Sequence, residues 1–231
     1  MIDREIEMKR NIDMNEISDG KLYTSADMVK VDCHGCPGCS DCCHGMGNSI
    51  VLDPMDIYRL QKAVGADLNA LISRGFLELN MVDGMILPNL RMNEKNDACS
   101  FLNDEGRCSV HAFRPGICRL FPLGRIYDEG GFKYFLQIHE CSCDHRSKMK
   151  TEKWIGIPKI KLYESYIYQW HCFLKECQDA MQELQEEHAK ILITYVLRVF
   201  YQTPYQAATD DEFYREWKAR MDKLRSVLNM E

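Results

Sequence analysis

The sequence predicts an α+β protein: an irregular, metal-organised cysteine-cluster domain with short helices and two hairpins, followed by a helical hairpin or bundle. Ten of the twelve cysteines fall between residues 33 and 150. Glycine is absent after residue 156, where long amphipathic patterns begin. We therefore expect three regions, namely an N-terminal arm over 1–32, a cysteine-cluster metal-binding domain over 33–150 and a helical extension over 151–231.

Two hairpins are predicted in the cysteine domain, each from apolar runs on either side of a turn that contains glycine. The first joins residues 77–82 to residues 85–90 through Asp83-Gly84. The second covers residues 123–138. Because each hairpin is short, neither supplies a large sheet, and we expect the metal to organise the loops around them.

Helices are predicted from capping residues and from apolar periodicity. Asp53-Pro54 supplies an N-cap and a first-turn proline for a helix that ends at Gly65, and Asp67 caps a second short helix. The helical extension carries three amphipathic patterns, and the second of them could continue the first. These patterns cover residues 160–178, 179–200 and 210–229.

The composition is that of a globular protein with a mild excess of acidic residues. The 231 residues are 45% hydrophobic and 28% charged, and the formal net charge is −6. This balance argues against a broad phosphate-binding surface, so nucleic acid is not an expected partner. The charged N-terminus lacks the apolar core of a secretory signal, and the longest apolar-rich run, Ile191–Phe200, is too short to span a membrane. We therefore expect a cytoplasmic protein without membrane contact, whose partner is an unknown protein or redox protein.

The strongest functional signal is a run of cysteines at three-residue spacing. It consists of Cys33, Cys36, Cys39, Cys42 and Cys43. Thiolates this close together repel one another unless a cation lies between them or disulfides join them. Because disulfides are not expected in a reducing cytoplasm, the run indicates a metal or redox site.

The spacing of the run favours an iron–sulfur cluster over zinc. A structural zinc usually takes two Cys-x2-Cys pairs separated by many residues, whereas continuous x2 spacing is typical of a loop that wraps a cluster. The run ends in Cys42-Cys43 and lacks the final Cys-Pro of ferredoxins, so zinc stays open as the alternative. Neighbouring side chains of an extended segment point apart, so Cys42 and Cys43 are not expected to bind one small ion together.

Later cysteines are expected to supply the remaining ligands. Residues 96–122 should be mostly loop and hold three cysteines, and one of Cys141 and Cys143 should join them. The eight expected metal ligands are Cys36, Cys39, Cys42, Cys43, Cys99, Cys108, Cys118 and Cys141. Eight thiolates could hold two four-coordinate centres, or one cluster with spare cysteines. Whether Cys33 or Cys143 also binds is left open.

Arg114 and Arg119 are the expected cofactor-binding residues that do not ligate the metal. A guanidinium can donate hydrogen bonds to an anionic thiolate site and so tune its properties. The alternative is that both are ordinary surface arginines.

These motifs together resemble the YkgJ-type cysteine-cluster family. The resemblance rests on the run from Cys36 to Cys43, on Cys99-Ser-Phe-Leu, on Cys108, and on Arg114-Pro115-x2-Cys118-Arg119-x-Phe121-Pro122. It covers about residues 33–145 and implies a domain that chelates zinc or iron. In this sequence Cys33 extends the family run by one step, and His111 stands where the family often has an aromatic residue.

The function expected from these observations is that of a metal-binding cysteine-cluster protein. Its cofactor should be an iron–sulfur cluster, with 4Fe–4S as one form, in a redox or group-transfer role. A structural zinc module for partner interaction is the alternative. Likeness to a flagellin lysine methylase of the same family implies a further alternative, a protein methyltransferase that uses S-adenosylmethionine. No catalytic residue is predicted, and whether the protein is an enzyme is left open.

Overall fold

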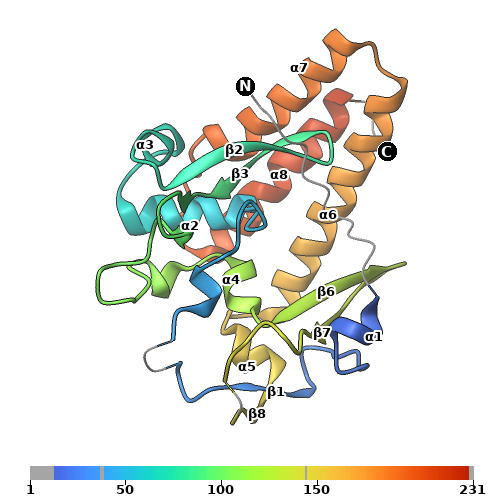
Figure 1. The fold of residues 1–231 in the computed structure, drawn as a ribbon. Helices are drawn as coiled ribbons and strands as arrows, with labels where there is room; N and C mark the ends of the chain where they lie inside the picture. The colour runs from blue at the N-terminus through green and yellow to red at the C-terminus, as the bar shows by residue number, and fades with distance from the viewer. Residues whose placement is uncertain (1–12, 37–38, 144, 229–231) are drawn as a thin grey trace.

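The computed structural model describes residues 13–36, 39–143 and 145–228 (Figure 1). Short helices and two-stranded hairpins make up the first part of the chain, and long helices make up the last part. The predicted α+β class is therefore confirmed. The first twelve residues of the predicted arm, and Asn229 at the end of the last predicted helix, lie outside the described residues.

The two helices predicted for the cysteine domain form with the expected caps. Helix α2 spans Pro54–Val64, and Asp53 and Asp56 complete a capping box in which each carboxylate accepts from the other residue's backbone N–H. Gly65 ends this helix in the left-handed conformation, at φ 66°. Helix α3 spans Leu68–Ser73 and has its predicted aspartate as N-cap. The caps thereby fix where α2 begins, which matters because that end of the helix faces the cysteines.

Both predicted hairpins are present. Strands β2 (Leu77–Val82) and β3 (Met85–Leu90) pair in the predicted register, and both residues of their turn have positive φ, at 45° and 79°. Strands β6 (Leu123–Asp128) and β7 (Gly131–Leu136) form the second hairpin. Each hairpin is a separate two-stranded sheet, so among the described residues the strands build no larger sheet.

Two strand pairings were not predicted. Strand β1 (Met28–Asp32) pairs antiparallel with β8 (Ser147–Lys150), and we call this pair the ribbon. Strand β4 (Met92–Asn93) pairs with β5 (Ala98–Cys99). All four strands are short, and β1 fully buries only its two valines. The ribbon joins the end of the predicted arm to the end of the predicted cysteine domain, whose boundaries stay a prediction.

Five short helices of the described residues were not predicted from the sequence. The five helices are α1 (Met14–Ile17), η1 (Asp41–Cys43), η2 (His111–Phe113), α4 (Gly116–Leu120) and α5 (Thr151–Ile155). Two of them, η1 and η2, are single 3-10 turns. Three of them, η1, η2 and α4, lie in the cysteine-rich loops and give those loops a defined path.

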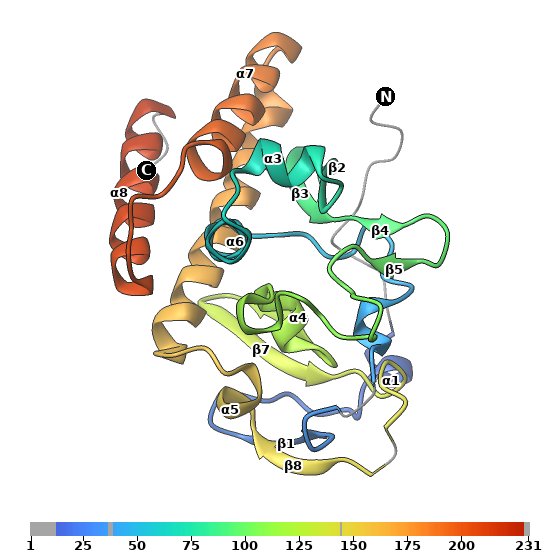
Figure 2. The same cartoon turned by 90° about the vertical axis from the view of Figure 1, so that its left-hand side faces the viewer.

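The helical extension consists of long helices that pack along one side of the molecule (Figures 1 and 2). They are α6 (Ile160–Glu183), α7 (Glu186–Leu197), the π-helical turn η3 (Arg198–Gln202) and α8 (Asp210–Leu228). Helix α7 does not continue α6, because Leu184 takes an extended conformation between them. Among the helices of the described ranges, none is long and apolar enough to cross a membrane.

Tyrosines from the extension bind the backbone around the start of α2. The Tyr166 hydroxyl donates to Asp53 Oδ1 and accepts from Met55 N, both at 3.0 Å. The Tyr201 hydroxyl donates to the Leu52 carbonyl, also at 3.0 Å. These hydroxyls are buried and satisfied, so the extension and the cysteine domain share one core.

Candidate metal site

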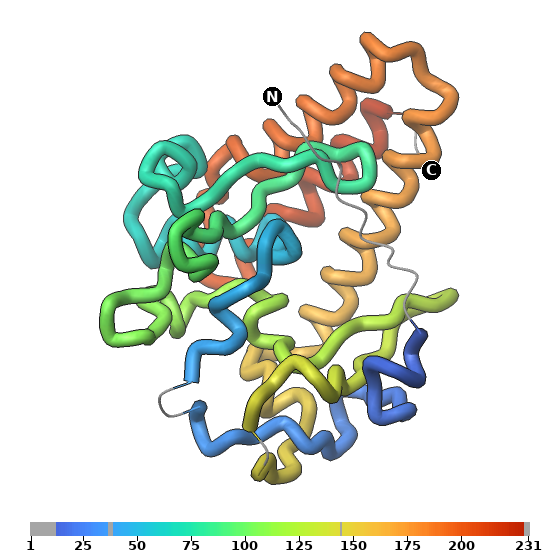
Figure 3. Tube along the Cα trace, viewed as in Figure 1, coloured from blue at the N-terminus to red at the C-terminus, as the bar shows by residue number. Residues whose placement is uncertain are grey.

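Cys42 and Cys43 lie in η1, on the segment that climbs from the ribbon toward α2 (Figure 3). The backbone N–H of Cys43 donates to the Ser40 carbonyl at 2.8 Å, which closes the turn. The two Sγ atoms are 4.0 Å apart. The expectation that these side chains point apart is therefore wrong, because it assumed an extended backbone and the segment forms a 3-10 turn.

Three further cysteines reach this turn from distant parts of the sequence. An isolated bridge between His44 and Ala98 brings β5, which ends in Cys99, beside η1. Cys108 follows on the far side of the same loop, and α4 carries Cys118. We call this set the α4 thiol group, and it comprises Cys42, Cys43, Cys99, Cys108 and Cys118.

The thiols of this group act on one another's protonation. A hydrogen bond from Cys43 lowers the pKa of Cys42 to about 7 against the effect of burial, and the charge of Arg114 assists. The same hydrogen bond, then burial, then the charges of Cys42, Cys99 and Cys108 raise the pKa of Cys43. The pair thus shares one proton near neutral pH, and a metal ion that binds both sulfurs must displace it.

The helix that carries Cys118 is held by α2 and α6. The backbone N–H of Gly116 donates to Asp56 Oδ1 at 2.7 Å. Tyr163 of α6 packs so tightly on Gly116 that an added Cβ would overlap its hydroxyl. Burial, followed by the charge of Asp56, raises the pKa of Cys118 well above its usual range. The extension therefore positions one of the predicted ligands.

The two predicted arginines do different things. Arg114 lies close enough to Cys42 and Cys108 for its charge to favour both thiolates. Its buried Nε has no hydrogen-bond partner among the described residues. Arg119 instead donates to main-chain carbonyls, from Nε to Arg114 at 3.0 Å and from Nη2 to Ala112 at 2.6 Å. Arg114 is thus the cation beside the thiols, and Arg119 stabilises the loop that carries it.

Five other thiols of the predicted cysteine domain gather beside the ribbon. We call them the ribbon thiol group, and they are Cys33, Cys36, Cys39, Cys141 and Cys143. The Sγ atoms of Cys33 and Cys141 are 3.8 Å apart. Burial, followed by hydrogen bonds with Cys143 and Cys141, raises the pKa of Cys33. The sequence left Cys33 and Cys143 open as ligands. The Cys-x2-Cys spacing of Cys33 and Cys36 indicates a pair of ligands. No sequence pattern near them indicates that this pair contacts the distant segment with Cys141 and Cys143.

The donors suit a soft metal centre. Each group holds five thiols, and thiolates are the ligands that zinc and iron–sulfur clusters take. The closest sulfurs come in pairs: within the described ranges, no three Cys, His, Asp or Glu side chains converge tightly enough to hold an ion without moving. The charge of Cys42 also acts on Cys36, so the two groups are neighbours.

The thiols of both groups lie within the stretch from residue 33 to residue 143. Residues 33–144 match the CxxCxxCC family. The description of that family is "Putative zinc- or iron-chelating domain". Every thiol of both groups lies in this matched stretch, which we call the CxxCxxCC domain after the model that it matches, and the helical extension lies outside it. A search of curated proteins and a search of solved structures returned no match. The likeness to a flagellin lysine methylase stays a prediction.

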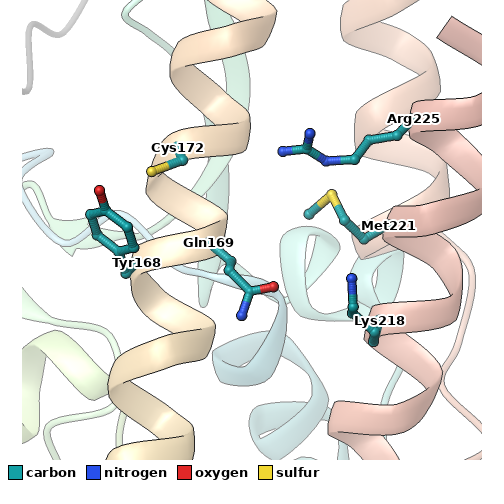
Figure 4. A pocket seen from close by; sticks show the side chains of 6 residues that line it. All are labelled: Tyr168, Gln169, Cys172, Lys218, Met221 and Arg225. Carbon is teal, nitrogen blue, oxygen red and sulfur yellow. The ribbon is translucent and has the colours of Figure 1, made fainter. Parts of the chain in front are cut away.

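A separate groove lies in the helical extension, between α6 and α8 (Figure 4). Its volume is ≈ 320 Å³, and Cys172 lines it from α6 while Lys218 and Arg225 line it from α8. Both cations have carboxylate partners, since Lys218 pairs with Asp222 at 2.7 Å and Arg225 with Glu176 at 2.7 Å. The groove therefore presents no uncompensated charge, and Cys172 lies apart from both thiol groups.

Proposed function

We infer that the α4 thiol group binds an iron–sulfur cluster and that the protein acts in electron or group transfer. The observation that carries this inference is the donor set itself. Five thiols from distant segments meet beside the Arg114 cation, and four cysteines are the usual ligand set of an iron–sulfur cluster. When bound, such a cluster would supply one-electron redox chemistry.

The residues around the group suit an anionic cofactor. Arg114 contributes a positive charge next to Cys42 and Cys108, and its Nε has a free donor. Hydrogen bonds and charges at cluster sulfurs are among the factors that set reduction potentials. Asp56 and Tyr163 fix α4, so Cys118 is held in place before any metal arrives.

A structural zinc ion at the same group is the second candidate, and one distance favours it. The Sγ atoms of Cys42 and Cys43 are 4.0 Å apart. Two thiolates on a tetrahedral zinc, each at about 2.3 Å from the ion, are about 3.8 Å apart. In that case the CxxCxxCC domain would be a scaffold, and its helical extension would serve as the surface for a partner.

Anaerobic purification of the full chain distinguishes the two candidates. We expect iron and acid-labile sulfide in similar amounts, and a brown colour that dithionite bleaches. The Cys108→Ser variant should lose both iron and sulfide, whereas Cys172→Ser, whose thiol lies in the helical groove, should keep them. A colourless protein with zinc in place of iron, and without acid-labile sulfide, would exclude the cluster and support the scaffold.

A further inference from the structure

The ribbon thiol group has no part in the function inferred above, although its geometry is well defined. Its cysteines come from the two ends of the CxxCxxCC domain. Two contacts fix these ends side by side. The Asp41 carboxylate accepts from both the backbone N–H and the hydroxyl of Ser142. On the other flank, the Ser147 hydroxyl donates to Asp32 Oδ2 at 3.1 Å, where β1 meets β8. The thiols lie between these two clamps.

One pair of sulfurs in this group is at ligand spacing. Cys33 Sγ and Cys141 Sγ are 3.8 Å apart, which is too long for a disulfide, whose S–S bond is about 2.05 Å. It equals the separation of about 3.8 Å that two thiolates have on one tetrahedral zinc. Cys143 and Cys36 also neighbour Cys33.

The backbone at Cys33 favours a tight turn around this point. The N–H of Cys36 donates to the Cys33 carbonyl at 3.2 Å, and His34, Gly35 and Cys36 all have positive φ, at 55°, 83° and 51°. Such a turn is uncommon for residues other than glycine. Arg107 Nη1 binds the Cys36 carbonyl at 2.9 Å and so holds the end of the turn.

Cys39 is the member of the group that is engaged elsewhere. Its thiol lies beside the Asp41 carboxylate, the same carboxylate that accepts from Ser142. Four thiols remain, in a Cys-x2-Cys pair and a Cys-x-Cys pair that are far apart in the sequence. Two Cys-x2-Cys pairs that are far apart in the sequence are the usual arrangement of a structural zinc site, and this set departs from it in the shorter spacing of the second pair.

We propose that Cys33, Cys36, Cys141 and Cys143 bind a structural zinc ion, a second metal centre separate from the one at the α4 thiol group. Cys36 and Cys143 turn further toward the Cys33–Cys141 pair as the ion binds. The zinc joins the ribbon to the loops of the CxxCxxCC domain. The proposal goes beyond the inferred cluster and holds whichever metal the α4 group takes.

Elemental analysis of single variants tests this separation. The full chain is produced with both iron and zinc in the medium, purified anaerobically and assayed for zinc, iron and acid-labile sulfide per chain. Cys33→Ser and Cys143→Ser should each lose one zinc equivalent and keep the metal of the α4 group. Cys108→Ser should keep that zinc and lose the other metal. Cys39→Ser is the matched control within the run and should keep both.

A further variant covers the case in which loss of zinc prevents folding. Cys143→His replaces a thiolate with an imidazole, which zinc accepts in a Cys3His site, so this variant should fold and keep its zinc. The proposal is overturned if Cys33→Ser keeps its full zinc, or if Cys33→Ser and Cys108→Ser each lose both metal centres. The inferred cluster fails by a different result, namely wild-type protein with two zinc ions and no sulfide.

Discussion

The contact between Gly116 and Tyr163 gives a sharp test of how the extension holds the cysteine loops. Gly116 begins α4, two residues before Cys118, and its φ is not positive, so alanine suits its backbone. Space is the only obstacle. A Cβ at this position would overlap the Tyr163 hydroxyl, while the next neighbours, Tyr163 Cζ and Asp56 Oδ1, would lie at 3.2 and 3.7 Å.

The free-energy changes follow from these contacts. Forcing a methyl group into packed space costs about 1–3 kcal/mol. Alanine also stabilises the folded protein by about 0.4–1 kcal/mol, because it restricts the unfolded chain more than glycine does. The Gly116→Ala variant should therefore lose about 1–2 kcal/mol of unfolding free energy. Tyr163→Phe should cost about 1.5–3 kcal/mol, because Arg125 Nη2 donates to this hydroxyl at 3.1 Å. In the double variant the overlapping oxygen is gone, so its cost should fall about 1–2 kcal/mol below the sum of the single costs.

Equilibrium unfolding in urea of the anaerobically purified protein measures this difference. Wild type, both single variants and the double variant form the cycle. Gly131→Ala is the control, because a Cβ there would meet nothing within 4 Å, and it should change stability by less than about 0.5 kcal/mol. Single costs that add to within about 0.5 kcal/mol in the double variant would show that Tyr163 does not confine Gly116.

Two further predictions concern the helical extension. Asp210→Asn should cost about 1–2 kcal/mol, because it leaves the Arg59 guanidinium, 10% exposed, without its carboxylate at 2.7 Å. Asp211→Asn, whose ion pair is exposed on both sides, should cost almost nothing, and equal urea midpoints for the two variants would contradict the difference. Burial, followed by the charge of Lys175, lowers the pKa of His171. The unfolded chain therefore binds this proton at higher pH, and the stability that the neutral ring contributes is lost as pH falls below about 6.5. His171→Phe keeps a ring to stack on Tyr127, so its unfolding midpoint should depend less on pH between about 5 and 6.5, and an unchanged slope would count against this role.

Local signals were enough to predict helices α2 and α3, both longer hairpins and the helical character of the extension. Asp53 and Gly65 delimit α2 because caps act within one turn of the helix they end. The Asp83-Gly84 turn fixes the first hairpin because both residues must take positive φ. Each of these depends only on neighbours in the sequence, so one sequence suffices to find them.

Long-range pairings could not be predicted in the same way. Strand β1 is five residues long and its partner β8 lies more than a hundred residues away, so no local pattern identifies the pair. The division of the thiols has the same cause. The spacing of Cys42 and Cys43 could not reveal a 3-10 turn, and the even spacing of the run hid that its first three members face Cys141 while its last two face Cys99.

A metal ion held between the ends of the ribbon would also restrict the unfolded chain. Cys33 and Cys141 are 108 residues apart in sequence. A link between their sulfurs through a metal ion closes a loop of that length, and for a covalent link a loop of about 100 residues removes about 4.7 kcal/mol of chain entropy from the unfolded state. Every member of the α4 thiol group lies inside that loop. Once a metal ion links the two sulfurs, the five thiols of the α4 thiol group are confined to a smaller volume in the unfolded chain. They therefore find one another and their metal more readily.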